Sequence, residues 1–327
     1  MMNLLEQLKQ YSVVVADTGD IDAIRQFAPE DATTNPSIIL NSVKSGSYDH
    51  ILMSIVDSVR QKKLPTEEAI ASISDQLIVA MGIEILECIP GRVSTEVDAR
   101  LSYDTAASIA KARHLVSLYE QAGISRSRIL IKLAATWEGI KAAQILESEG
   151  IQCNLTLIFG FAQARACAEA GVFLISPFVG RILDWYRREY PETDYLPEDE
   201  PGVQSVKQIF HYYRELGYPT LVMGASFRNT GEIVALAGCD RLTINPALLS
   251  QLQSLEGGLH PALSASAGNV MNVEQTIDPL TEAQFRQQMQ DDVMASEMLA
   301  SGISGFEADQ VQLEQLITTC LLSESSA

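Results

Sequence analysis

The stretch 128-RILIKLAATWEGIKAAQILESEG-150 is the clearest indication of the fold class, because it contains the pattern of one complete strand and helix. Residues 129–133 form an apolar run of the length and composition of a buried strand. Residues 137–149 have the spacing of an amphipathic helix, and Gly150 follows them as helix-ending glycines do. We therefore expect a β/α unit of the kind that builds parallel sheets.

Similar units recur along the chain. Eight β-rich runs are predicted, at residues 13–16, 32–34, 93–97, 129–133, 154–158, 173–176, 220–223 and 242–244. Helical runs lie between them, at 105–121, 137–149, 161–170, 182–190 and 231–237, and three more glycines follow helices, at Gly123, Gly171 and Gly238. The interval 37–90 is long enough for two helices, and 281–322 is predicted to be a helical tail.

Eight β/α units in about 250 residues are typical of an α/β protein with a (β/α)8 TIM barrel. We expect a single domain over 1–327, with the barrel at about 11–256 and a C-terminal helical extension at about 281–322. A doubly wound open sheet is the alternative. Residues 191–202 are predicted to be an acidic loop and 257–272 a small-residue connection, and neither has the character of a domain linker.

Composition narrows the function classes. The chain has 46% hydrophobic residues and a net charge of −19, which disfavours binding to nucleic acid or to anionic membranes. No stretch approaches the roughly 20 apolar residues of a membrane span, and the N-terminus lacks the features of a signal peptide, so we expect a cytoplasmic protein. The five cysteines show no CxxC spacing and are expected to be reduced. No glycine-rich nucleotide motif occurs, so no organic cofactor is predicted.

Lys132 is the most informative single residue, because it lies inside an apolar strand. Desolvation disfavours an ammonium group and lowers the pKa of a buried lysine, and a neutral amine is a nucleophile toward carbonyls. The alternative is a structural lysine that extends its ammonium to the surface or pairs with a carboxylate. The segment alone leaves both interpretations open.

Polar residues also follow the other predicted strands. In a barrel they would converge on the mouth at the carboxyl ends of the strands, where barrel active sites lie. They are Asp17, Asn35, Glu96, Asn154, Thr156, Ser176, Ser226, Arg228 and Asn245. Several are also good helix caps. Glu96 and Lys132 are the hardest to explain in that way, although a structural ion pair between neighbouring strands would do so.

A metal site is not predicted. None of the four histidines falls at a strand end. Asp17, Glu96 and Asp98 carry oxygen ligands of the type that Mg²⁺ prefers, but a nearby lysine would compete for them.

Several motifs resemble the signature stretches of the transaldolase family. They are 14-VVADTGD-20, 31-DATTNPS-37, 131-IKLAATW-137, 154-NLTL-157, 175-ISPFVGR-181 and 223-MGASFR-228. They occur in the family's order, and the resemblance extends from about Leu5 to the C-terminal helix. It implies a Schiff-base barrel enzyme that moves a dihydroxyacetone unit between sugar phosphates in the non-oxidative pentose phosphate pathway. It also implies that neither metal nor cofactor is needed, and that the chain forms a homodimer like the bacterial dimeric relatives.

The resemblance assigns catalytic roles by position. Lys132 would attack the C2 ketone of fructose 6-phosphate or sedoheptulose 7-phosphate. Glu96 would shuttle protons through a water that Thr156 also holds. Asp17 would take the C4 hydroxyl proton as the C3–C4 bond breaks, and the enamine left on Lys132 would attack glyceraldehyde 3-phosphate or erythrose 4-phosphate.

The resemblance also assigns substrate-binding roles. Three residues would hold the hydroxyls of the three-carbon unit, namely Asn35, Asn154 and Ser176, and three would bind phosphate, namely Arg181, Ser226 and Arg228. Phe178 stands where the related fructose-6-phosphate aldolases have tyrosine, and an apolar ring there favours transfer over cleavage. Thr33 lines the same mouth. Gly160 departs from the serine usual in close bacterial relatives. A fructose-6-phosphate aldolase-like lyase and a barrel that only binds sugar phosphates are the alternative functions.

Overall fold

A computed structural model describes residues 2–264 and 278–323. Eight parallel strands form a closed barrel in the order in which they occur in the chain. Their bounds are β1 (Val13–Asp17), β2 (Asp31–Thr33), β3 (Val93–Glu96), β4 (Ile129–Ala134), β5 (Cys153–Ile158), β6 (Leu174–Pro177), β7 (Leu221–Gly224) and β8 (Arg241–Ile244). Because β1 pairs with β8, the sheet has no edge, which confirms the (β/α)8 barrel and excludes the open sheet.

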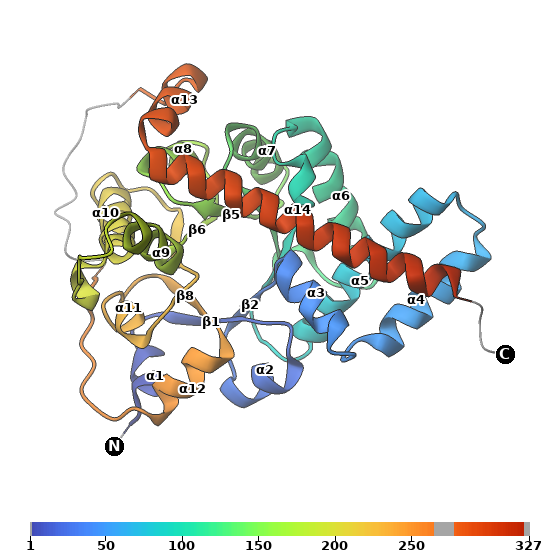
Figure 1. The fold of residues 1–327 in the computed structure, drawn as a ribbon, viewed down its shortest axis with the longest axis horizontal. Helices are drawn as coiled ribbons and strands as arrows, with labels where there is room; N and C mark the ends of the chain where they lie inside the picture. The colour runs from blue at the N-terminus through green and yellow to red at the C-terminus, as the bar shows by residue number, and fades with distance from the viewer. Residues whose placement is uncertain (1, 265–277, 324–327) are drawn as a thin grey trace.

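Helices surround the barrel (Figure 1). The first group is α1 (Leu4–Leu8), α2 (Ile21–Phe27), α3 (Pro36–Lys44), α4 (Asp49–Gln61), α5 (Thr66–Leu86), α6 (Thr105–Gln121) and α7 (Trp137–Ser148). The second is α8 (Phe161–Glu169), α9 (Val179–Glu189), α10 (Pro201–Glu215), α11 (Thr230–Val234), α12 (Pro246–Ser254), α13 (Glu282–Asp291) and α14 (Val293–Leu322). Short 3-10 turns are η1 (Ala99–Leu101), η2 (Arg126–Arg128) and η3 (Pro197–Asp199). The glycines predicted to end helices at 123, 150, 171 and 238 all have left-handed φ angles.

The structure corrects the expected helix content in several places. Residues 37–90 contain three helices rather than two, because a turn with Gly46 at φ +78° ends α3 and Pro65 precedes α5. The structure also contains helices that were not predicted, namely α1, α2, α10 and α12, and the acidic stretch 191–202 ends in the first two residues of α10. Of the predicted connection 257–272, the part after residue 264 lies outside the described residues.

The barrel interior changes from apolar to polar along the strands. Val15, Leu130, Leu174 and Met223 form a buried apolar cluster inside the barrel. Side chains two residues apart on a strand point to the same side of the sheet. Lys132 therefore follows Leu130 on the inner side, one layer nearer the mouth. The strand alternation thus brings a polar layer directly above the apolar interior.

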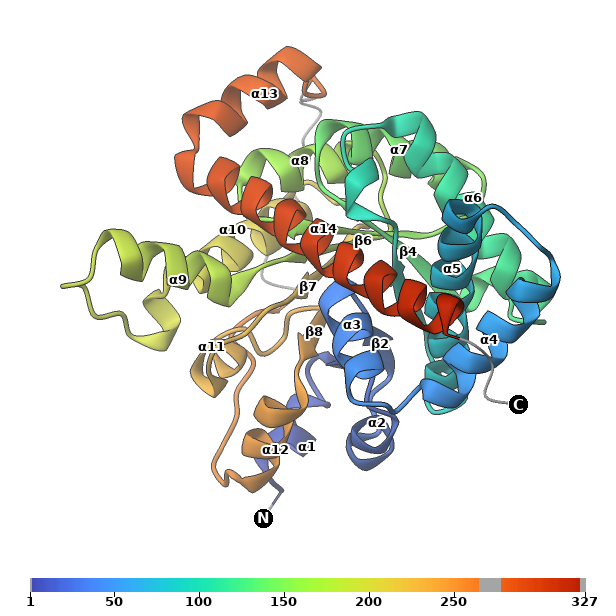
Figure 2. The same cartoon turned by 45° about the vertical axis from the view of Figure 1, so that its right-hand side comes forward.

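Helix α14 crosses the barrel mouth, as the two views of the ribbon show (Figures 1 and 2). It contacts α3, α5, α9 and β5, which lie on different sides of the barrel. Helix α14 packs closely against β5 at Gly302, where an added Cβ would lie 2.8 Å from Leu157 Cδ2. Gly160, which stands where serine is usual in close bacterial relatives, lies against the start of the same helix. A Cβ added there would lie 2.8 Å from Ala295 Cβ. The C-terminal helical extension is therefore part of the barrel mouth, at the carboxyl ends of the strands.

Helix α5 corrects the expectation that no stretch of the chain approaches the length of a membrane span. Its 21 residues are long and apolar enough to span a membrane, contrary to the expectation that no stretch approaches this length. Length and composition are weak evidence, since 56% of the apolar window is buried within the protein. Its Asp75 is buried and bonded to Lys111 Nζ at 2.7 and 2.9 Å, so the helix has the packing of a core element.

Candidate active site

Lys132 and Glu96 are register partners on the adjacent strands β3 and β4. Lys132 Nζ lies 3.1 Å from Glu96 Oε2, and the two side chains are only 5% and 4% exposed. Nζ also donates to the Thr34 carbonyl at 3.3 Å. Glu96 Oε2 receives no well-aligned hydrogen bond from the described residues, so this contact is an ion pair. That oxygen keeps the capacity to accept a proton from water or substrate.

Asp17 lies at the end of β1, within electrostatic reach of Lys132. Thr33 Oγ1 donates to Asp17 Oδ1 at 2.9 Å, and the same hydroxyl lies 2.7 Å from Thr243 Oγ1. The position of Asp17 at the cavity leaves it partly exposed, but burial still raises the pKa of its carboxyl. Attraction to Lys132 opposes that rise. Burial likewise raises the pKa of Glu96 against the opposing attraction of Lys132. Carboxyls with raised pKa values are suited to move protons near neutral pH.

Strands β5 and β6 supply a hydrogen-bonded row beside the lysine. Asn154 is the register partner of Lys132, and its Nδ2 donates to Ser94 Oγ at 3.1 Å. Ser176 Oγ donates to Asn154 Oδ1 at 2.6 Å. Thr156 Oγ1 is buried and has no hydrogen-bond partner among the described residues. Buried hydroxyls are normally satisfied. The orphan Thr156 group therefore has room for a bond to water or substrate.

Arg181 projects from the first turn of α9 into an aromatic setting. Its guanidinium carbon lies 5.1 Å from the centre of the Phe178 ring and 5.7 Å from that of Phe306 on α14. No carboxylate of the described chain forms an ion pair with it. Burial and the nearby Arg228 lower its pKa. A largely buried guanidinium that no carboxylate of the described chain pairs with directly is prepared for an anionic ligand.

The other predicted anion ligands adjoin Arg181. Ser226 has a left-handed backbone with φ +60°, a strained conformation for serine that is common at functional sites. The Arg228 guanidinium donates to Asp184 Oδ2 at 2.6 and 2.9 Å and is about half exposed. Asn35 caps α3 by accepting from Ile38 N at 2.9 Å.

A small cavity of about 70 Å³ joins these groups at the carboxyl ends of the strands. Nine predicted site residues line it, namely Asp17, Thr33, Asn35, Lys132, Thr156, Ser176, Phe178, Arg181 and Ser226. Glu96 and Asn154 lie beside it through their contacts with Lys132 and Ser176, whereas Arg228 is directed to Asp184. Asn245 caps α12 and does not line the cavity. Sequence reasoning missed Ser94, Thr243 and Phe306, although alternation along β3 and β8 is a signal for the first two.

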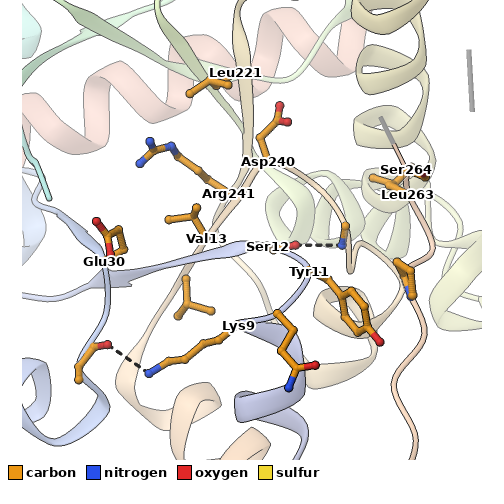
Figure 3. A pocket seen from close by; sticks show the side chains of 15 residues that line it. Lys9, Tyr11, Ser12, Val13, Glu30, Leu221, Asp240, Arg241, Leu263 and Ser264 are labelled. Atoms are coloured by element: carbon orange, nitrogen blue, oxygen red, sulfur yellow. Dashed lines mark hydrogen bonds between the residues drawn. The ribbon is translucent and has the colours of Figure 1, made fainter. Parts of the chain in front are cut away.

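A larger cavity of about 870 Å³ lies at the opposite end of the barrel, where the strands begin (Figure 3). Its cations already have partners within the protein. Arg241 pairs with Asp31, and Lys9 Nζ donates to the carbonyls of Phe27 and Ala28 at 2.6 and 3.1 Å. This end of a barrel generally serves stability, so size alone does not make the cavity an active site.

Residues suited to a metal do not gather in this structure. Within residues 2–264 and 278–323, no group of three or more His, Cys, Asp or Glu side chains is placed to hold an ion. His114 Nε2 lies 3.4 Å from Asp75 Oδ2, outside the barrel mouth. The chemistry available at the mouth is that of an amine, two carboxyls, hydroxyls and a guanidinium.

This closed β/α barrel has an amine and two carboxyl groups with raised pKa values at the C-terminal ends of its strands, which is the architecture of an enzyme. The family model described as "Transaldolase/Fructose-6-phosphate aldolase" matches residues 14–317. The chain is similar to proteins named transaldolase in three bacteria: it is 57% identical to that of Cellvibrio japonicus (strain Ueda107) over 317 residues, 56% identical to that of Shewanella sp. (strain W3-18-1) over 321, and 55% identical to that of Methylobacillus flagellatus over 317. Each alignment covers 97% of this chain and at least 98% of the relative.

The chain therefore belongs to the transaldolase/fructose-6-phosphate aldolase family, and it is a transferase enzyme.

Proposed function

We propose that this enzyme transfers a dihydroxyacetone unit from a ketose phosphate to an aldose phosphate through a Schiff base on Lys132. The observation that carries the proposal is the buried pair of Lys132 Nζ and Glu96 Oε2, 3.1 Å apart beside a cavity that also contains Asp17 and Arg181. A buried lysine can pass a proton to such a carboxylate and become nucleophilic. The family match supports this chemistry.

The first half of the reaction forms the covalent intermediate. Lys132 Nζ attacks the C2 carbonyl of sedoheptulose 7-phosphate or fructose 6-phosphate, and the carbonyl oxygen takes up a proton to give a carbinolamine. Glu96, through a water held by Thr156, then protonates the leaving hydroxyl, which departs as water and leaves an iminium ion. The unsatisfied oxygens Thr156 Oγ1 and Glu96 Oε2 support a water at this place.

The second half breaks and makes a carbon–carbon bond. Asp17 removes the proton of the C4 hydroxyl, the C3–C4 electron pair moves into the iminium, and the aldose phosphate leaves. The resulting enamine attacks the aldehyde carbon of glyceraldehyde 3-phosphate or erythrose 4-phosphate, and the earlier steps reverse. Asn35, Asn154 and Ser176 hold the hydroxyls of the three-carbon unit while it waits for the acceptor.

Substrate selection follows from the cations at the mouth. Arg181, Ser226 and Arg228 bind the phosphate, while Phe178 keeps the site apolar near the reacting carbons and Thr33 orients Asp17. Arg181 supports this assignment most directly, because the described carboxylates leave it without an ion pair. Local cations also explain how a chain of net charge −19 accepts an anionic substrate.

A coupled assay tests the proposal. With fructose 6-phosphate, release of glyceraldehyde 3-phosphate should require erythrose 4-phosphate as acceptor. Lys132→Met should abolish that release, whereas Lys141→Met, a change on the outer helix α7, should not. Equal release without the acceptor would favour the fructose-6-phosphate aldolase-like lyase. Binding without any release would favour a barrel that only binds sugar phosphates.

The wider setting is also part of the proposal. We propose sugar phosphates as the ligands, with neither nucleic acid nor membrane as a partner, and a homodimer that works in the cytoplasm in the non-oxidative pentose phosphate pathway. Acidic charge supports the exclusion of polyanionic partners. Sedimentation of the purified enzyme is the direct measurement of its oligomeric state.

A further inference from the structure

Two carboxyl groups lie buried behind the proposed phosphate site, and the mechanism does not use either. Glu200 precedes α10 and is 2% exposed, and Glu232 lies in α11 and is 0% exposed. The backbone N–H of Arg228 donates to Glu232 Oε2 at 2.6 Å. Asn229 connects the two carboxyls, because its side-chain Nδ2 donates to Glu200 Oε1 at 3.3 Å and its backbone N–H donates to Glu232 Oε2 at 3.4 Å.

The remaining oxygens of this pair indicate a proton between them. Glu200 Oε2 and Glu232 Oε1 are both buried and have no donor among the described residues. Asn229 holds both carboxyls, so these two orphan oxygens belong to neighbouring groups. Two ionised carboxylates contain only acceptors, so the two oxygens can satisfy each other only when one of the carboxyls carries a proton. Like charges that share a buried site cannot easily both ionise.

No neighbouring cation of the described chain neutralises the two carboxyls in place of that proton. No cation of the described chain forms an ion pair with Glu200 or Glu232. Burial raises the pKa of Glu232 to about 7, and Glu200 adds to the rise. The charged groups on the surrounding elements form other hydrogen bonds or are exposed to solvent. Arg228 is bonded to Asp184, Lys207 to the carbonyl of Glu198, and the side chains of Glu198 and Asp199 are exposed.

The turn at residues 226–229 is held from two sides. Gly180 N on α9 donates to Ser226 O at 2.9 Å, and a Cβ on Gly180 would lie 2.5 Å from the Arg228 side chain. Glu232 holds the other side through the Arg228 backbone. A shift of α11 would therefore move Ser226 and Arg228, whereas Lys132 lies on a separate strand.

We infer that Glu200 and Glu232 share one proton and act as positioning residues that hold Ser226 and Arg228 in place for the phosphate. Loss of the proton places two negative charges together, pushes α11 away from Glu200 and weakens phosphate binding. The inference rests on the proposed phosphate role of this turn. It predicts an alkaline loss of affinity that does not come from the reacting groups.

Calorimetric titration of the full chain with inorganic sulfate measures this effect, because sulfate does not itself titrate near neutral pH. The sulfate Kd of the wild type should rise about tenfold between about pH 6 and about pH 9, the change expected for one lost buried hydrogen bond. In Glu200→Gln the amide donates to Glu232 without a shared proton, so the Kd should stay flat. Glu198→Gln, an exposed neighbour, should keep the wild-type profile.

Infrared titration tests the shared proton without a ligand. A carboxylic-acid C=O band should disappear from the wild type as pH rises past about 7, and Glu200→Gln should lack that band. Persistence of the band in Glu200→Gln, or a wild-type pH profile for sulfate in that variant, would overturn the inference. Neither result bears on labelling of Lys132, so failure here and failure of the proposed function are distinguishable.

Discussion

Lys132 and Glu96 face each other across adjacent parallel strands, with Nζ and Oε2 3.1 Å apart and almost no solvent exposure. A buried ion pair is weak evidence for stability, since desolvation offsets most of the attraction between the charges. The proposed proton transfers and the proposed carbon–nitrogen bond on Lys132 give this costly arrangement a reason. Substitution of Glu96 is therefore the first test of this pair.

Glu96→Gln keeps the size of the side chain but removes its ability to exchange protons. We expect the rate of transfer to fall by about 10²- to 10⁴-fold, the usual contribution of a positioned general acid–base group. Single-turnover measurement of iminium formation is the direct assay. Asp98→Asn, two residues along and paired with Arg100, is the matched control and should retain most of the rate. Comparable loss in both variants would contradict a specific role for Glu96.

Asp17 should couple activity to stability. Its folded pKa is raised, so the unfolded chain releases this proton first as pH rises. The contribution of Asp17 to the free energy of unfolding is therefore full below its unfolded pKa of about 4 and is lost as pH rises through the folded pKa. Asp17→Asn should lose transfer activity by about 10²-fold or more. It should also become more stable relative to the wild type across that window.

Urea titrations of both proteins at several pH values measure this difference. Thr33 can still donate to the amide oxygen of the variant, so the comparison isolates the charge. A pH-independent difference in the free energy of unfolding would contradict the raised pKa.

Arg181 should determine affinity for the phosphate more than turnover. Arg181→Lys retains the charge but loses the planar fork that stacks between Phe178 and Phe306. We expect KM for fructose 6-phosphate to rise by about 10- to 100-fold, the loss of a charge-assisted hydrogen bond, with a smaller change in kcat. Arg187→Lys, on the exposed side of the same helix, is the control. A lower kcat at unchanged KM would contradict the assignment.

Phe178 should separate transfer from cleavage. Its ring is 6% exposed and packs edge-on against Phe159, with 5.4 Å between the ring centres. Phe178→Tyr introduces a proton donor at the cavity, so we expect acceptor-independent release of glyceraldehyde 3-phosphate to rise by about tenfold, below the usual limit of general acid–base catalysis. Phe159→Tyr, the same change outside the cavity lining, should leave the ratio of cleavage to transfer unchanged. Equal ratios in the two variants would contradict this role.

The sequence predicted the barrel well because all eight strands have a local pattern, whereas helices α1, α2, α10 and α12 were not predicted. Lys132 was visible as a charge in an apolar strand, and Asp17 and Glu96 as acids at strand ends. Phe306 was not predictable in the same way, because the face that α14 turns to the mouth depends on its packing against β5 and α9. Thr243 resembles an ordinary β-branched strand residue until its hydroxyl is seen beside Thr33. The Glu200 and Glu232 pair likewise requires three-dimensional proximity.

Borohydride trapping is the decisive test of a Schiff base on Lys132. The enzyme is reduced with borohydride in the presence of fructose 6-phosphate and then mapped by peptide mass spectrometry. We predict a stable dihydroxyacetone adduct on the peptide that contains Lys132, and no adduct in a folded Lys132→Met variant. Absence of an adduct on Lys132 in the wild type, or equal labelling of the variant, would contradict it.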